Sequence, residues 1–264
     1  MFALKRPWGH IHYKLDGAAK SNTVLFINSL GTDLRMWDAV VAQLPTGMRV
    51  VRFDKPGHGL SADRGAPFDI DDMADDAMAL LDAVDVDQAV VVGCSIGGMI
   101  AQSICLRYTD RVTGVVFSNT APKIGTAESW ADRIRQVREN GINAISDAVL
   151  DRWFAPALRA SDACNAWKMM LERTTVDGYA GCCRAISRAD YSARIGDVHL
   201  PALVLAGAQD QATPSDQVKA FADEMPQARF TEFDACGHIP AIEQPEATAR
   251  ALTTFIKEMD SARA

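Results

Sequence analysis

The sequence predicts an α/β fold in which a mostly parallel, doubly wound sheet carries a helical cap inserted between two core strands. Apolar, β-branched segments alternate along the chain with segments of helical periodicity, as they do in sheets covered by helices on both faces. The alternation stops near Pro122, and strand-like segments return only after about Asp197. We therefore expect a core formed by residues 1–121 and 198–264 and an all-helical cap formed by residues 122–197.

Several segments have the composition of strands. In the first, HIHYKLDG, the residues Ile11, Tyr13 and Leu15 alternate with polar neighbours, which is typical of a half-buried strand. The others are more continuously apolar and indicate central strands: TVLFIN, VVRFD, AVVVGC, VTGVVFSN, PALVLAG and ARFTEFDA. Parallel neighbours among them need crossover connections, which the intervening helices would supply.

Helical patterns fill the connections between these strands. One apolar stripe at helical spacing is formed by Met73, Ala77, Leu80, Leu81 and Val84. The segment GGMIAQSICLRY, from Gly97 onward, is apolar enough to form a second helix under the sheet. In the expected cap, Thr126 is a suitable N-cap for a helix through residues 130, 134 and 137, and apolar residues at 142, 145 and 149 mark another.

Composition limits the class of protein. The 264 residues are 48% apolar and 23% charged, which is ordinary for a globular domain. The apolar runs are too short to cross a bilayer, and the first residues lack the apolar core of a signal peptide, so we expect a cytoplasmic protein without membrane attachment. A formal net charge of −7 argues against nucleic acid or an anionic membrane surface as a partner, and an anionic small-molecule substrate would need a local cationic pocket. The sequence carries no signal for an oligomeric state.

Metal and cofactor motifs are missing from the sequence. The six cysteines stand at no regular spacing and form no C-x-x-C pair, so we expect reduced thiols. The patterns H-E-x-x-H and G-x-G-x-x-G do not occur, and neither does a phosphate-binding loop. We therefore expect chemistry that uses no metal and no other cofactor.

The strongest chemical signal is the segment VVVGCSIGGM, in which Gly93, Ser95 and Gly97 fill the pattern G-x-S-x-G. An apolar strand precedes it and a helical pattern follows, which is the setting of a nucleophile on a tight strand-to-helix turn. Glycines flank the serine because side chains there would collide with neighbouring backbone. We expect Ser95 to be the catalytic nucleophile and the adjacent Cys94 to be a packing residue.

A serine hydroxyl needs a base to remove its proton, and imidazole is suited to this near pH 7. His238 follows the last predicted strand, in FDACGHIPAIEQPE, at the sheet edge where the serine turn opens, so it is the expected base. His10 and His12 alternate with apolar residues on an early strand and are expected to face solvent. His58 lies in the glycine-rich segment DKPGHGLS, where we expect a structural hydrogen-bonding role, and His199 precedes a strand.

The acid that orients the base is expected after a strand between Ser95 and His238. Asp210 lies a few residues past such a strand, in PALVLAGAQDQATP. The rival position, at the end of the preceding strand in VVFSNTAP, holds Asn119, and an amide cannot stabilise an imidazolium as a carboxylate does. Asp210 is therefore the expected third member of the triad.

Two backbone N–H groups are needed to stabilise the oxyanion that forms when the serine attacks. One is expected from Ile96, the residue after the nucleophile. The other is expected from Leu30, in the loop NSLGTDLRMW, where Gly31 permits an unusual turn. Many proteins with this serine motif carry His-Gly where this chain has Asn28 and Ser29, but backbone donors do not depend on those side chains.

With these residues in place, the chain resembles the α/β hydrolases over nearly its whole length. More narrowly it resembles the 3-oxoadipate enol-lactonases of the β-ketoadipate pathway of aromatic catabolism. The likeness is carried by the segments NSLGTDLRMWD, FDKPGHGLS, SNTAPKIGTAESWADRI, DAVLDRWFAP and GYAGCCRAI, three of which lie in or near the expected cap. The resemblance implies an α/β-hydrolase fold and opening of a five-membered enol-lactone by an acyl-enzyme, without a cofactor.

The resemblance also assigns roles to residues of this chain. It carries Ser95, Asp210 and His238 over as the triad, with Leu30 and Ile96 as oxyanion donors. Within ESWADRI, it implies that Trp130 covers the substrate ring and that Arg133 pairs with its carboxylate. Lys123 and Arg35, near the cap entrance and the oxyanion loop, are alternative cations for that carboxylate.

Two departures keep other functions open. The chain reads HIPAIE where the lactonases usually have H-x-S-N-x-E, and CSIGG replaces the more frequent L-S-M-G-G. The same triad also suits a C–C bond hydrolase of ring-cleavage products or a cofactor-free esterase or perhydrolase. A non-catalytic ligand receptor on the same fold is a further alternative, although a receptor does not require the complete triad.

Overall fold

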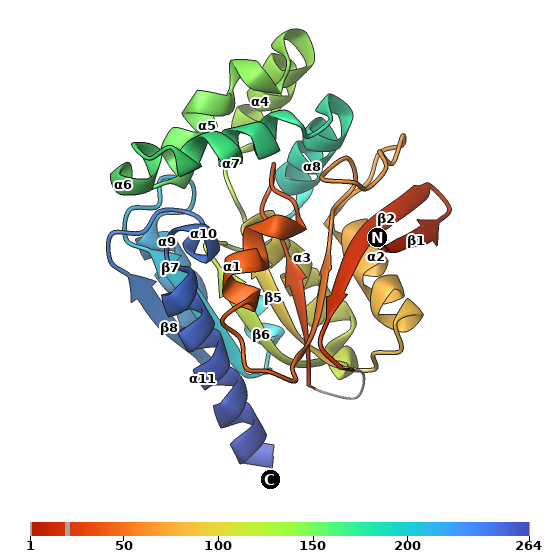
Figure 1. The fold of residues 1–264 in the computed structure, drawn as a ribbon, viewed down its shortest axis with the longest axis vertical. Coiled ribbons are helices and arrows are strands. Elements are labelled where there is room, and N and C mark those ends of the chain that lie inside the picture. Colours follow the sequence, from red (N-terminus) through yellow and green to blue (C-terminus); the bar gives the residue numbers. More distant parts are fainter. Residues whose placement is uncertain (1, 19–21, 264) are drawn as a thin grey trace.

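The computed structural model describes residues 2–18 and 22–263. These residues form an eight-stranded sheet in the order β1-β2-β4-β3-β5-β6-β7-β8 (Figure 1). The strands are β1 (Phe2–Arg6), β2 (Gly9–Asp16), β3 (Thr23–Ile27), β4 (Arg49–Phe53), β5 (Ala89–Cys94), β6 (Val112–Ser118), β7 (Ala202–Gly207) and β8 (Ala228–Phe233). From β4 to β8 all neighbours are parallel, whereas β2 is antiparallel to both β1 and β4. The predicted mostly parallel sheet is confirmed.

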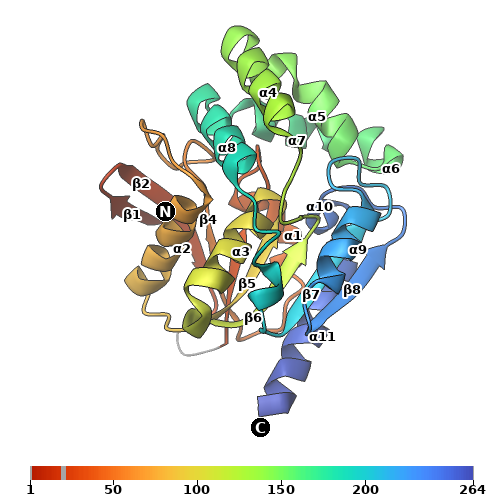
Figure 2. The same cartoon turned by 180° about the vertical axis from the view of Figure 1, so that it is seen from behind.

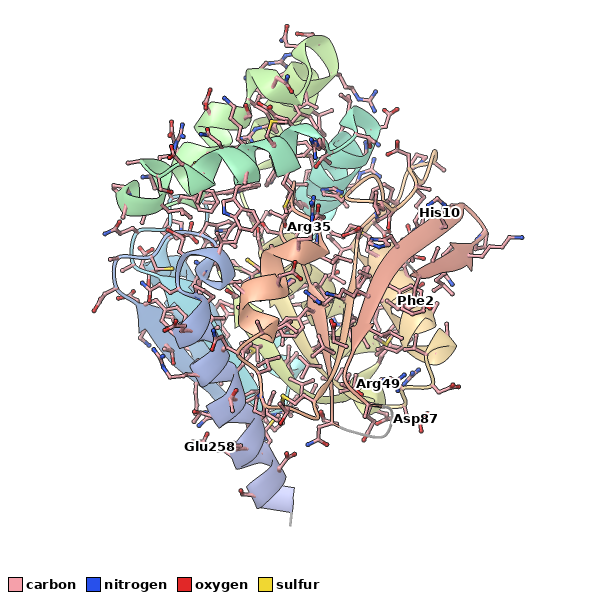
Figure 3. All side chains as sticks on the ribbon, in the orientation of Figure 1. Phe2, His10, Arg35, Arg49, Asp87 and Glu258 are labelled. Carbon is pink, nitrogen blue, oxygen red and sulfur yellow. The ribbon has the colours of Figure 1, made fainter. Side chains whose placement is uncertain are left out.

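Strand β1 is the one strand of the described sheet that the sequence pattern does not predict. It is five residues long, ends in the charged pair Lys5 and Arg6, and is only partly buried. It pairs as a hairpin with β2, with Phe2 opposite Tyr13 and their ring centroids 5.5 Å apart. Phe2 lies at the edge of the sheet (Figure 3). Cross-strand packing of this kind stabilises a strand whose own composition gives a weak signal.

Helices cover both faces of the sheet. The described core helices are α1 (Asp38–Val41), α2 (Ile70–Ala83), α3 (Ile96–Arg107), α9 (Ser215–Asp223), α10 (Pro240–Glu243) and α11 (Pro245–Arg263). Helices α1 and α11 pack together on one face, and α2 and α3 on the other (Figures 1 and 2). Every residue of β3, β5 and β7 is buried, as the continuously apolar composition of these strands predicts. Short 3₁₀ helices span Leu34–Trp37, Thr109–Arg111, Ile142–Ala144 and Ile195–Asp197.

Between β6 and β7, where the whole segment is described, the chain forms helices and no strand. These are α4 (Ala127–Asn140), α5 (Ser146–Trp153), α6 (Pro156–Arg159), α7 (Ala163–Glu172) and α8 (Val176–Arg188), which we call the cap helices. They lie together beyond one end of the sheet (Figure 1). Thr126 caps α4 by accepting a hydrogen bond from the Ser129 N–H, as expected. Domain boundaries at residues 122 and 197 stay a prediction.

The position of the cap helices decides where a ligand can bind. Parallel strands of this sheet point their carboxyl ends toward the cap helices, so the loops after β3, β5, β7 and β8 lie under them (Figure 2). Ligands bind at this edge in open α/β sheets. Within the described part of the chain, none of the helices has the length and apolar character needed to span a membrane.

A buried carboxylate ties the β1–β2 hairpin to the core, and its removal tests that connection. Asp76 on α2 is 2% exposed and accepts hydrogen bonds from Arg6 Nε at 2.7 Å and Trp8 Nε1 at 3.3 Å. Asp76→Ala leaves three donors without this acceptor, because Arg64 Nη1 also donates to the carboxylate at 3.4 Å. We expect the substitution to lower the free energy of unfolding by about 2–3 kcal/mol in urea titrations. The control Asp87→Ala removes an aspartate from the molecular surface (Figure 3) and is expected to change it by less than about 0.5 kcal/mol. Equal effects would contradict this account.

Candidate active site

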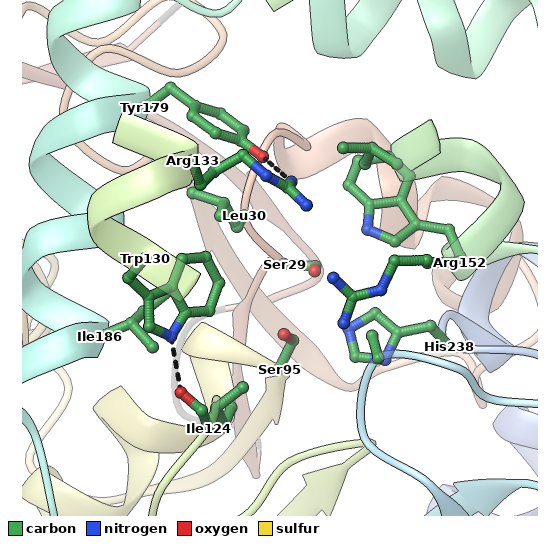
Figure 4. A pocket seen from close by; sticks show the side chains of 13 residues that line it. Ser29, Leu30, Ser95, Ile124, Trp130, Arg133, Arg152, Tyr179, Ile186 and His238 are labelled. Atoms are coloured by element: carbon green, nitrogen blue, oxygen red, sulfur yellow. Dashed lines mark hydrogen bonds between the residues drawn. The ribbon is translucent and has the colours of Figure 1, made fainter. Parts of the chain in front are cut away.

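Ser95 occupies the strained turn that the G-x-S-x-G pattern predicts, between β5 and α3. Its φ of 58° lies in the left-handed region, which costs a non-glycine residue about 1–3 kcal/mol. A Cβ atom at Gly93 would lie 2.1 Å from the Gly97 carbonyl oxygen, and one at Gly97 would lie 2.2 Å from the Ile27 carbonyl oxygen. The flanking glycines are therefore required by the close approach of backbone, and the turn directs Ser95 into the pocket (Figure 4).

His238 and Asp210 meet at the edge of the sheet, although 28 residues separate them in the chain. The His238 Nδ1 atom lies 2.8 Å from the Asp210 Oδ2 atom, and both residues are buried. A carboxylate accepts only, so Nδ1 carries the proton and Nε2 keeps its lone pair. The imidazole lines the same pocket as Ser95 (Figure 4). The structure thus brings together all three residues of the expected triad.

The Asp210 carboxylate is held by donors other than the histidine. Asn119 Nδ2 donates to it at 2.9 Å, Thr213 Oγ1 at 2.8 Å, and the Ala212 backbone N–H at 2.7 Å. Burial alone would raise the pKa of Asp210, but its electrostatic interaction with His238 and the donated hydrogen bonds lower it overall. Asn119, which the sequence presented only as a rival position for the acid, therefore helps to hold the acid in place.

The loop that carries His238 is bonded directly to the cap helices. The His238 backbone N–H donates to the Trp153 carbonyl oxygen at 2.6 Å. The partly buried Glu243 carboxylate accepts from the Gly237 N–H at 2.9 Å and from the Ala155 N–H at 2.7 Å. Burial raises the pKa of Glu243 in spite of these bonds. Glu243 is part of the segment HIPAIE, which the sequence marked only as a departure from the lactonases.

The two expected oxyanion donors lie on either side of Ser95. Leu30 lies in the loop after β3 and lines the pocket, and Ile96 is the first residue of α3. Among the residues that the structure describes, neither backbone N–H donates to another group, so both are available to a ligand. Gly31 has a φ of 73°, which agrees with the unusual turn expected there.

Another histidine, His58, supports the loop that carries Leu30. The His58 Nε2 atom accepts from the Gly31 N–H at 3.0 Å, and its Nδ1 donates to the Pro56 carbonyl oxygen at 2.9 Å. Burial lowers the pKa of His58 well below its ordinary value, so the ring is neutral, and its expected structural role is confirmed. The expectation that His12 faces solvent is wrong, because its Nδ1 lies 2.7 Å from a carboxylate oxygen of the buried Asp54.

The pocket above Ser95 has a cavity volume of about 50 Å³ and is roofed by the cap helices. Trp130 and Arg133 both line it, as the resemblance implies (Figure 4). The Trp130 indole N–H donates to the Ile124 carbonyl oxygen at 2.6 Å, and Arg133 Nη1 donates to the Tyr179 hydroxyl at 3.1 Å. These bonds hold an aromatic face and a guanidinium at the pocket wall.

A second guanidinium, which the sequence did not single out, faces the same pocket. Arg152 on α5 points its side chain toward the space above Ser95 (Figure 4). Neither Arg133 nor Arg152 pairs with a carboxylate of the described residues. Burial of its guanidinium and the nearby charge of Arg133 lower the pKa of Arg152, although part of the residue remains exposed. The pocket therefore concentrates positive charge in a protein whose net charge is −7.

The alternative cations do not reach this pocket. Lys123 pairs with Asp190 at 3.0 Å, and Arg35 pairs with Asp33 at 2.6 Å, both outside it.

One polar side chain of the pocket has no hydrogen-bond partner among the described residues. Ser29 is fully buried, and its Oγ makes no hydrogen bond with any described residue while it faces the same space (Figure 4). In the described ranges, no three His, Cys, Asp or Glu side chains form a group that could hold a metal ion.

Comparison with known proteins agrees with this arrangement. The model of the family described as the alpha/beta hydrolase fold matches residues 22–245. The chain is 32% identical to 3-oxoadipate enol-lactonase 2 of Acinetobacter baylyi over 252 residues, which cover 95% of this chain and 94% of that protein. It is 30% identical to the pimeloyl-[acyl-carrier protein] methyl ester esterase of Aromatoleum aromaticum, covering 84% of this chain and 93% of that protein.

A solved structure gives the same result in three dimensions. The enol-lactonase from Burkholderia xenovorans LB400 superposes with a TM-score of 0.93 at 33% identity, and the match covers 97% of this chain and 99% of that one. The resemblance found in the sequence to the α/β hydrolases, and to enol-lactonases among them, is confirmed. The family match, the eight-stranded sheet and the serine turn lead to one conclusion: the chain belongs to the α/β-hydrolase family.

Proposed function

We propose that this protein is a serine hydrolase that opens a carboxylate-bearing enol-lactone, converting 3-oxoadipate enol-lactone to 3-oxoadipate. The observation that carries the proposal is that one pocket joins Ser95 and His238 to the unpaired guanidiniums of Arg133 and Arg152. Ser95 and His238 are suited to acyl transfer, and the two guanidiniums are suited to binding an anionic group of the substrate. Similarity to enol-lactonases over 95% of the chain supports the choice of lactone.

In the first half of the proposed reaction, His238 Nε2 takes the proton from Ser95 Oγ as the oxygen attacks the lactone carbonyl carbon. The backbone N–H groups of Leu30 and Ile96 donate to the oxyanion. Asp210, 2.8 Å from the imidazole, stabilises the imidazolium that forms. Collapse of the tetrahedral intermediate breaks the ring C–O bond, and the acyl group stays on Ser95.

The second half of the reaction releases the product. The ring oxygen leaves as an enolate, which is a good leaving group; it takes the proton from the His238 imidazolium, and the resulting enol becomes the ketone. The neutral His238 then deprotonates a water molecule that attacks the ester carbonyl, and the imidazolium returns the proton to Ser95 Oγ as the acyl bond breaks. One water is consumed, and a second carboxylate appears in the product.

Charge selects the substrate in this proposal. A net charge of −7 repels an anion, and the carboxylate must also lose water when it enters the pocket. Arg133 and Arg152 offset both costs, and the Trp130 ring covers the lactone. We further propose that the substrate enters between a core of residues 1–121 and 198–264 and a cap of residues 122–197. The enzyme would act in the cytoplasm on this small molecule.

An esterase or perhydrolase is the second candidate, favoured by the similarity to a methyl ester esterase at 30% identity. It would use the same triad on a neutral ester. A C–C bond hydrolase would instead act on vinylogous diketones. A non-catalytic receptor would bind ligands without turnover. The four functions are distinguished by the turnover rates of an enol-lactone, an aryl acetate and a vinylogous diketone. Each enzyme is expected to prefer its own class of substrate, whereas a receptor would turn over none of them.

The nucleophile is tested by Ser95→Ala. Because the substitution removes one oxygen at a buried turn, the protein is expected to stay folded while kcat falls on the order of 10⁴–10⁶-fold. The matched control Cys94→Ala changes the neighbouring buried thiol and is expected to keep its activity. Near-normal turnover by Ser95→Ala would exclude the assignment.

The orienting acid is tested by Asp210→Asn. An amide in place of the carboxylate cannot stabilise the imidazolium, and its NH₂ group favours the wrong imidazole tautomer. Steady-state kinetics are expected to show kcat lower by about 10³–10⁴-fold, with KM little changed. A loss smaller than about tenfold would indicate that His238 acts without Asp210.

The anion site is tested by Arg133→Ala and Arg152→Ala, each assayed with the anionic lactone and with a neutral aryl acetate. Loss of one guanidinium is expected to cost the lactone about 2 kcal/mol, or roughly 30-fold in kcat/KM, and to spare the neutral ester. Arg135→Ala is the charge-matched control, because Arg135 lies exposed on the same helix as Arg133 and pairs with Asp132. If both substrates lose efficiency equally, the arginines do not bind a carboxylate.

A further inference from the structure

A fully buried lysine lies under the loop that offers one oxyanion donor. Lys55 follows β4 and is 0% exposed. Its Nζ atom donates to the Asn28 carbonyl oxygen at 3.0 Å and to the Ser29 carbonyl oxygen at 2.9 Å. No carboxylate of the described residues lies within ion-pair distance of it. Burying an ammonium without a paired anion is costly, so its placement against two carbonyl groups calls for an explanation.

The covalent geometry of the loop supplies one. The Ser29 carbonyl and the Leu30 N–H belong to the same planar peptide group, so a donor that fixes the carbonyl also fixes the direction of the N–H. Thr32 donates to the same oxygen through its N–H at 3.2 Å and its Oγ1 at 2.8 Å. Lys55 differs from Thr32 because it brings a positive charge. A charge on the carbonyl side polarises the peptide and makes its N–H a stronger donor.

We propose that Lys55 is a positioning residue for the oxyanion hole, which orients the Ser29–Leu30 peptide and strengthens the Leu30 N–H toward the oxyanion. This inference rests on the proposed function, since it takes Ser95 as the nucleophile and Leu30 as a donor. Lys55 makes no bond to the substrate. Its effect is largest when negative charge has developed, so it acts on kcat rather than on KM.

The expected magnitude follows from known oxyanion holes. Complete removal of one donor costs about 10²–10³-fold in kcat. Without Lys55, the Leu30 N–H stays in the loop but loses its polarisation and part of its orientation. We therefore expect a loss of roughly 10- to 100-fold.

The charge on Lys55 also predicts a dependence on pH. Burial lowers the pKa of Lys55 to about 8, so the ammonium is lost as the pH rises through that value. The groups that face it are Asp33, Asp54, His58, Cys94 and Cys182. Burial raises the pKa of Cys182 to about 12, raises that of Cys94 further, and lowers that of His58, so these three stay neutral from pH 7 to 9. Wild-type kcat is therefore expected to decline on the alkaline side of pH 8.

The test compares Lys55→Met and Lys55→Arg with the matched control Arg52→Met. Arg52, on the strand that leads to Lys55, is 1% exposed and pairs with Asp16 at 2.6 Å, away from the pocket. The substrate is p-nitrophenyl acetate, so the outcome does not depend on the identity of the lactone. A small alkyl trifluoromethyl ketone, whose adduct with serine carries an oxyanion, serves as the inhibitor.

Lys55→Met is expected to lower kcat by roughly 10- to 100-fold and to leave KM within about twofold of the wild-type value. The inhibition constant of the trifluoromethyl ketone is expected to rise by the same factor by which kcat/KM falls. Its alkaline decline is expected to disappear. Lys55→Arg, which stays charged at pH 9, is expected to restore part of kcat without that decline. Arg52→Met is expected to lower the melting temperature and leave kcat unchanged.

Two results would overturn the inference. One is a Lys55→Met variant whose kcat, calculated per folded enzyme, equals that of the wild type, as is expected for Arg52→Met. The other is a folded Lys55→Met variant that binds the trifluoromethyl ketone as tightly as the wild type, because the oxyanion would then not depend on Lys55. If Lys55→Met does not fold, a Lys55→Arg variant that keeps the alkaline decline of the wild type would show that the charge of Lys55 does not act on kcat. Ser95→Ala is assayed alongside. If it retains turnover, the proposed function fails, whereas an inactive Ser95→Ala with an active Lys55→Met rejects only the role of Lys55.

Discussion

The hydrogen bond between His238 Nδ1 and Asp210 Oδ2 is the interaction on which the rest of the site depends. It joins the loops after β8 and β7, and it is itself held from two directions. Asn119, at the end of β6, donates to Asp210, while the Trp153 carbonyl of the cap helices accepts from the His238 backbone. Consecutive parallel strands and the segment inserted between β6 and β7 therefore converge on one imidazole. The parallel order of the sheet makes this possible, because it brings these carboxyl ends to one edge.

The charged and polar groups at this edge of the sheet fall into two sets, one around the reacting residues and one at the pocket wall. The Asp210 carboxylate is surrounded by donors that lower its pKa, and the neutral His58 and the buried Lys55 support the loop after β3. Above them, Arg133 and Arg152 face the pocket without carboxylate partners among the described residues. Fixed dipoles near Ser95 can stabilise negative charge that develops during a reaction. Guanidiniums without a carboxylate partner can instead bind negative charge that a substrate already carries.

The fold and the convergence of Ser95, Asp210 and His238 at one edge of the sheet could be predicted because each rests on a local pattern. Apolar runs mark the central strands, and glycines at 93 and 97 mark the serine turn, since a Cβ at either position would collide with backbone. Strand β1 was not predictable, because its pairing with β2 stabilises it more than its own composition does. Arg152, Asn119 and Lys55 were missed for a related reason. None of the three stands in a recognisable motif, and the feature that singles each one out is its position beside residues far away in the chain.

Under the proposed function, an enol-lactone acylates Ser95 during turnover. This can be measured by a rapid acid quench of the enzyme during turnover of the lactone, followed by mass spectrometry of its peptides. Ring opening on the enzyme keeps every atom of the substrate, so the peptide containing Ser95 is expected to gain the full mass of the lactone, and fragmentation is expected to place that mass on Ser95. An adduct on Cys94 instead of Ser95, or quenched enzyme that carries no adduct on any residue, would show that Ser95 is not acylated.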